Sequence, residues 1–172
     1  MYLPKIIGFA LVFLGCSGLG VFYSMQMKQK ILHIKEMIRI LEMFCSEIDY
    51  GQSTLPECCE VIGEKVSLPY GEILQRISAY PKEEGIAFGE ISDRYLRDGL
   101  KELPVGEEKE AFIKCFLDIG YADGWMQKRC MERGIEQLQG YLDTEEAEIK
   151  TKSKLAVTLG IMCGLLLVLI ML

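Results

Sequence analysis

Two long apolar runs enclose a charged middle. Residues 6–27 and residues 155–172 contain no charged side chain, whereas residues 28–154 hold every acidic residue of the chain. A helix rises about 1.5 Å per residue, so runs of this length can cross a hydrocarbon core of roughly 30 Å. The pattern predicts an N-terminal transmembrane helix in residues 1–27, a helical domain in 28–154 and a C-terminal transmembrane helix in 155–172.

The segment after the first run carries one apolar stripe at helical spacing. No Gly or Pro interrupts residues 21–50, so the first membrane helix is expected to continue as one rod ending at Gly51. The stripe lasts less than three heptads, which favours packing inside its own domain over a coiled coil. It consists of Ile31, Ile34, Ile38, Leu41, Cys45 and Ile48.

Turn and capping residues divide the rest of the middle into further helices. Thr54 and Glu57 form a capping box with Pro56 in the first turn, and no alternation or hairpin turn indicates a strand. We expect an all-α cytoplasmic bundle of about six helices between the two transmembrane helices. The later predicted elements are a helix to about Lys65, one started by Ser67 and Pro69, a turn over 81–85, a helix over 86–100 weakened by Gly89, one ending at Ile119, and one from about Gly124 through Ile149 and on into the second apolar run.

Two other interpretations of the first run remain open. Lys5 followed by an apolar run fits a cleavable signal peptide, and Phe13-Leu14-Gly15-Cys16 loosely resembles a lipobox with Cys16 as the acylated residue. The run continues well past Cys16, and Lys28 follows it at once. Both features favour a retained anchor over a signal sequence.

Basic residues near the runs predict the orientation. The outer ends of the chain offer only Lys5, whereas the middle offers seven cations close to the runs. The excess of Lys and Arg on the cytoplasmic side therefore predicts a two-pass protein of the cell membrane with a cytoplasmic central domain. The seven cations are Lys28, Lys30, Lys35, Arg39, Lys150, Lys152 and Lys154.

The body of the middle is strongly acidic. Residues 40–149 contain 24 acidic and 11 basic residues, a net charge of −13. This balance disfavours nucleic acid as a partner and favours a basic protein. From charge alone, a solvated and soluble face is the preferred interpretation. The densest cluster is Glu145, Glu146 and Glu148.

No catalytic or metal-binding constellation stands out. The chain has one histidine, His33, and its seven cysteines form no C-x-x-C pair, so no standard zinc pattern can be assembled. We interpret the cysteines as reduced thiols used as small apolar residues, and His33 as an interfacial or solvated side chain. We expect no enzyme, no cofactor and no metal. An enzyme using paired carboxylates at the membrane surface would need a buried pair with a raised pKa.

Small residues recur inside both runs. Gly160-x-x-x-Gly164 and Cys16-x-x-x-Gly20 allow membrane helices to approach closely, within one chain or between two copies in a homo-oligomer.

Three motifs, in this order, resemble the stage III sporulation protein AB family. They are Ser46-Glu47-Ile48-Asp49-Tyr50-Gly51 before Thr54-Leu55, then Ile119-Gly120-x-x-Asp123-x-x-x-Gln127, then Glu145-Glu146-Ala147-Glu148 before the Lys-flanked terminal run. The family pattern has a proline before this leucine, whereas here Pro56 follows Leu55. Residues 66–105 carry no motif of the family.

The resemblance implies a mother-cell membrane protein in a complex that links mother cell and forespore. It implies a domain similar to the cytoplasmic domain of F-class platform proteins of type II secretion. The implied role is a non-catalytic platform or adaptor that docks a secretion-type ATPase among other membrane subunits. The alternative is an accessory membrane protein, a sensor or stabiliser, of another envelope complex.

The same resemblance supplies the candidate partner-binding residues. Two of them also have structural interpretations: Asp123 as a helix cap and Tyr50 as packing at the end of the first rod. The candidates are Glu47, Tyr50, Asp123, Gln127, Glu145, Glu146 and Glu148.

Overall fold

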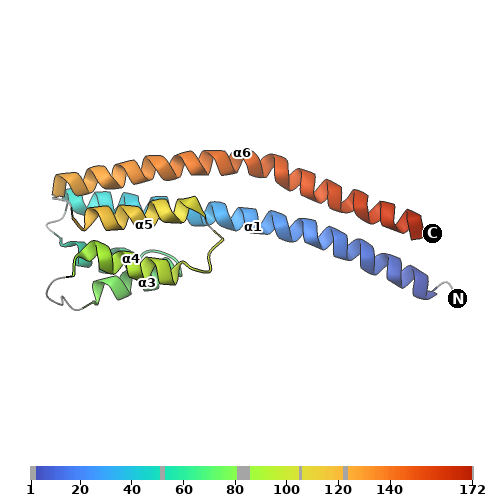
Figure 1. Cartoon of the computed structure of the whole chain (residues 1–172), viewed down its shortest axis with the longest axis horizontal. Helices are drawn as coiled ribbons and strands as arrows, with labels where there is room; N and C mark the ends of the chain where they lie inside the picture. The colour runs from blue at the N-terminus through green and yellow to red at the C-terminus, as the bar shows by residue number, and fades with distance from the viewer. Residues whose placement is uncertain (1–2, 51–52, 81–85, 105, 122–123, 172) are drawn as a thin grey trace. The chain divides into compact units, whose positions relative to one another are not determined.

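The protein is all-α in the part of the chain that is described. The computed structural model describes residues 3–50, 53–80, 86–104, 106–121 and 124–171. These residues form six helices and no strand, which confirms the prediction of an all-α protein with about six helices (Figure 1). The helices are α1 (Leu3–Tyr50), α2 (Leu55–Gly63), α3 (Tyr70–Ser78), α4 (Phe88–Gly99), α5 (Glu107–Ile119) and α6 (Gly124–Met171).

The chain divides into two compact units, each described by itself. The terminal unit combines the N-terminal part of α1, up to Ile31, with the C-terminal part of α6, from Asp143. The central unit spans Leu32–Leu142 and contains α2 to α5. The two long helices therefore contribute to both units.

The core of the central unit is built on the stripe of α1. Ile34, Ile38 and Leu41 are buried there as the 3-4 spacing predicts, and Phe44 lies among them. Phe44 meets Phe116 of α5 edge-on, with ring centroids 5.1 Å apart. Edge-to-face contacts of this kind suit the aromatic quadrupole and add about 0.5–1.5 kcal/mol beyond burial.

Glycines allow the closest helix contacts. A Cβ on Gly89 of α4 would collide with the carbonyl oxygen of Leu117 in α5, and a Cβ on Gly120 would collide with the backbone of Gly89. A Cβ on Gly134 of α6 would meet the Cys115 Sγ of α5. Gly89 weakens its own helix, but because it lacks a Cβ it allows α4 to pack directly on α5.

The predicted starts and stops agree with the observed helices to within a few residues. Glu57 Oε2 accepts a hydrogen bond from Thr54 N at 2.6 Å, as a capping box requires. The second helix ends at Gly63, slightly before the predicted Lys65, and the fourth covers Phe88–Gly99 within the predicted range.

The structure leaves the two predicted membrane spans as predictions. Among the described residues, no helix reaches the length and apolar character needed to cross a membrane. Most side chains of residues 6–27 and 155–172 lie outside the described set.

Candidate functional site

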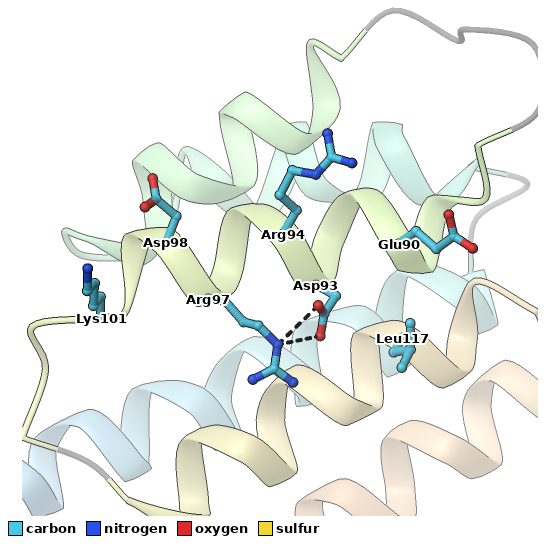
Figure 2. Close-up of a pocket in the computed structure, with 7 residues that line it drawn as sticks. All are labelled: Glu90, Asp93, Arg94, Arg97, Asp98, Lys101 and Leu117. Atoms are coloured by element: carbon cyan, nitrogen blue, oxygen red, sulfur yellow. Dashed lines mark hydrogen bonds and ion pairs between the residues drawn. The ribbon is translucent and has the colours of Figure 1, made fainter.

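A charged groove lies over α4 where it meets α5. The cavity measures about 780 Å³ and is lined by three acidic residues, three basic residues and Leu117 (Figure 2). Arg97 Nε donates to Asp93 at 2.9 Å, one helical turn away, and its Nη1 pairs with Glu110 of α5 at 2.8 Å. Glu90 Oε1 accepts a hydrogen bond from the Tyr121 hydroxyl at 2.9 Å.

These ion pairs make the groove a charged seam between two helices. Arg97 is half exposed, so each of its pairs is worth about 0.2–1 kcal/mol. The lining contains no histidine, cysteine or hydroxyl nucleophile. Within the described ranges, no group of acidic, histidine or cysteine side chains could hold a metal ion.

A second surface joins the end of α1 to the start of α6. A cavity of about 490 Å³ is lined there by Ile48, Asp49, Trp125, Lys128, Arg129 and Glu132. Trp125 in this lining is a large exposed apolar side chain, and Tyr121 and Met126, which are close to it in the sequence, are exposed too. We call Tyr121, Trp125, Met126, Lys128, Arg129 and Arg133 together the basic–aromatic patch. The sequence signal that marks it is the single Trp, followed within a few residues by Lys128 and Arg129.

Two of the predicted partner-binding residues lie in the central unit with contacts inside the chain. Glu47 of α1 is half-buried and pairs with Lys65 Nζ at 3.8 Å. Gln127 Nε2 donates to the carbonyl oxygen of Ile119 at 3.4 Å, at the end of α5. The Tyr50 side chain and the whole of Asp123 lie outside the described residues.

The three glutamates of the acidic cluster lie on α6 in the terminal unit. Glu145 Oε1 accepts a hydrogen bond from Lys30 Nζ at 2.6 Å, and both side chains are mostly buried. Glu146 and Glu148 are half-buried and also have polar partners. At least Glu145 of this cluster is therefore engaged in a contact between α6 and α1.

The thiols of the central unit are poor nucleophiles. Burial raises the pKa of Cys115 to about 12 and that of Cys45 to about 11, and it raises the pKa of Cys59 further. Thiolate formation is disfavoured at neutral pH. Five described cysteines are free, as the interpretation of them as apolar residues predicts.

His33, interpreted from the sequence as an interfacial or solvated side chain, is half-buried against a tyrosine. Its Nδ1 lies 3.4 Å from the Tyr70 hydroxyl, and the side chain is half-buried at the edge of the core. Burial lowers the pKa of His33, and Glu36 raises it by a smaller amount. His33 is therefore a neutral packing residue near pH 7.

The described helices and these surfaces define an all-α protein with charged surface grooves. The chain belongs to the stage III sporulation protein AB family, whose family model matches residues 5–172. It is thus a sporulation protein of stage III, as its three motifs indicated. No curated protein and no solved structure matches the chain.

Proposed function

We propose that this chain is a non-catalytic membrane platform, or adaptor, of a sporulation transmembrane complex that links mother cell and forespore. In this proposal residues 28–154 form a helical domain in the mother-cell cytoplasm. It docks a secretion-type ATPase through acidic helical surface, and Glu145, Glu146 and Glu148 provide part of that surface. The net charge of −13 over residues 40–149 is the observation that carries this proposal.

Charge complementarity is the physical reason for docking. A strongly acidic domain steers a basic partner towards it and rejects nucleic acid and anionic lipid surfaces. Two described surfaces, the groove on α4 and the basic–aromatic patch, offer ion pairs and exposed side chains suited to protein contact. An adaptor role requires no reacting group of the chain itself.

The proposed membrane anchors rest on the two uncharged runs. Phe22, Leu159 and Met162 are large apolar side chains exposed on the terminal unit. In water this exposure is unfavourable by about 25 cal/mol per Å² of apolar surface, whereas lipid would cover it. We expect the full chain to remain in the membrane pellet after an alkaline wash. Release of the chain into the supernatant would contradict the proposed membrane anchors.

Co-purification from sporulating cells tests the docking. A tagged full chain is expected to recover a secretion-type ATPase, and the E145Q/E146Q/E148Q variant is expected to recover at least tenfold less. Glutamine keeps the size of each side chain and removes only its charge. The change also weakens the Lys30 pair, so the variant must first show an unchanged circular dichroism spectrum and melting temperature.

A matched variant separates local docking from overall charge. E42Q/E102Q/E136Q removes the same charge from exposed positions of the central unit that line neither the groove on α4 nor the cavity beside Trp125. It should recover the ATPase as well as the wild type does. Equal losses in both variants would show that only net charge matters. Absence of an ATPase with the wild type would favour the alternative, an accessory subunit of another envelope complex.

A further inference from the structure

The only tryptophan of the chain lies on the surface of the central unit. Trp125 is 68% exposed, and Tyr121 and Met126 beside it are 64% and 46% exposed. Trp, Tyr, Met and Arg are enriched at protein interfaces, and clusters of exposed large apolar side chains mark binding sites. The basic–aromatic patch therefore has the composition of an interface core with a charged rim.

The cations of this patch are only partly neutralised inside the chain. Lys128 Nζ is held by Asp49 Oδ2 at 2.6 Å, and Glu132 lies 4.0 Å from it. Arg129 instead stacks on Trp125, with Cζ 4.9 Å from the ring centroid. Arg133, one turn further along α6, is exposed and has no acidic partner among the described residues. Two guanidinium groups thus face solvent in a domain that is otherwise acidic.

The same chain exposes a surface of opposite charge on α2. Glu60, Val61 and Glu64 are exposed on consecutive turns, and α2 contains no basic residue. Neither glutamate has a side-chain partner in the described part of the chain. Leu68, which follows α2, is 76% exposed. We call Glu60, Val61, Glu64 and Leu68 the acidic stripe.

We propose that the basic–aromatic patch of one copy docks on the acidic stripe of a second copy. Arg129 and Arg133 would pair with Glu60 and Glu64. Trp125 and Met126 would cover the exposed apolar side chains of the stripe. Both surfaces belong to the central unit, and this self-association does not depend on docking of an ATPase.

Local charge decides this contact even though each copy is acidic. At physiological salt the Debye length is about 8 Å, so repulsion between the distant acidic surfaces of two copies is largely screened. Pairs in direct contact are screened far less, and bidentate Arg–carboxylate pairs are the strongest of them. In a symmetric dimer the patch and stripe would meet twice, which doubles the contact.

Co-purification of two differently tagged full chains tests the proposal. The two copies are expressed together in a bacterium that makes no other sporulation protein, and they are extracted in mild detergent. Wild-type copies are expected to recover each other. W125A, or R129E/R133E in both copies, should lower recovery at least tenfold, which corresponds to a single interface hot spot.

A charge exchange makes the result specific. Two copies that both carry R129E/R133E/E60K/E64K have the charges of both surfaces exchanged, and they should again recover each other at close to the wild-type level. R76E/K101E changes the net charge by the same amount at exposed positions outside both surfaces and should leave recovery unchanged. Wild-type copies that fail to recover each other, R129E/R133E that behaves as wild type, or an exchange that restores nothing would each overturn the proposal.

Discussion

Replacing Gly89 with alanine tests the closest helix contact in the central unit. The added Cβ would approach the Leu117 carbonyl oxygen about 1 Å closer than ordinary van der Waals contact allows. It would also lie 3.2 Å from the Leu117 carbonyl carbon and 3.2 Å from its Cα. All three atoms belong to the backbone of α5, so a side-chain rotation cannot relieve the collision.

The magnitude follows from two opposing terms. Overpacking at a rigid site costs about 1–3 kcal/mol. Alanine is a better helix former than glycine by up to about 1 kcal/mol, although Gly89 lies in the first turn of α4, where this gain is smaller. The overpacking term wins, and we expect G89A to lower the free energy of unfolding by about 1–2 kcal/mol. At roughly 4 °C per kcal/mol, the melting temperature should fall by about 4–8 °C.

Gly140 provides the matched control. It lies in α6 of the same unit, and a Cβ there would meet nothing within 4 Å. G140A should therefore raise the free energy of unfolding by about 0.5–1 kcal/mol. The assay is thermal unfolding of the full chain in detergent, followed by circular dichroism at the helix band. If G89A stabilised the protein as G140A does, the close approach of α4 and α5 would be refuted.

Three further predictions concern buried polar groups. Ser92 Oγ is buried without a described hydrogen-bond partner. In chemical denaturation, S92A should therefore leave the free energy of unfolding unchanged or raise it by about 1 kcal/mol. A lower free energy of unfolding would mean that the hydroxyl has a partner. Burial lowers the pKa of His33 in the folded state, so the unfolded state binds more protons below its pKa of roughly 6.5. Stability should fall as the pH drops from 7.5 to 5.5, and H33N, measured by the same denaturation, should show a smaller fall. Maleimide labelling of the native chain at pH 8, mapped by mass spectrometry, should leave Cys115 and Cys59 unmodified until unfolding, and early labelling of either would contradict their burial.

The helices could be predicted because burial imposes a period on the sequence. Ile34, Ile38 and Leu41 recur at the spacing of one helix face, and all three lie in the core. Local chemistry marked the boundaries equally well: Thr54 and Glu57 satisfy the free backbone groups at the start of α2. Neither signal requires knowledge of what lies opposite a given residue.

The packing of the helices on one another could not be predicted in this way. Gly89 was expected to weaken its helix, and nothing in its neighbourhood in the sequence indicates Leu117 or Gly120 as the contact. His33 was expected to be interfacial or solvated, and nothing near it in the sequence indicates its contact with Tyr70, 37 residues later. Both outcomes depend on pairs that are distant in the chain, which a single sequence does not specify.

The candidate site shows the same division between local and distant signals. Motif resemblance selected Glu47 and Gln127, whose described contacts with Lys65 and Ile119 lie inside the chain. A motif residue can serve a contact inside the chain as well as a contact with a partner. For the glutamates of the acidic cluster, the glutamine substitutions distinguish these two roles only when folding is measured together with binding. Recognition depends instead on which side chains remain uncovered after folding. Trp125 is a large apolar residue of a kind that usually packs in a core, yet it is exposed beside Arg129. The net charge of −13 over residues 40–149 therefore determines which partners are attracted from a distance. The surface that binds a partner is determined by local side chains, whose charge can be opposite to the net charge of the domain.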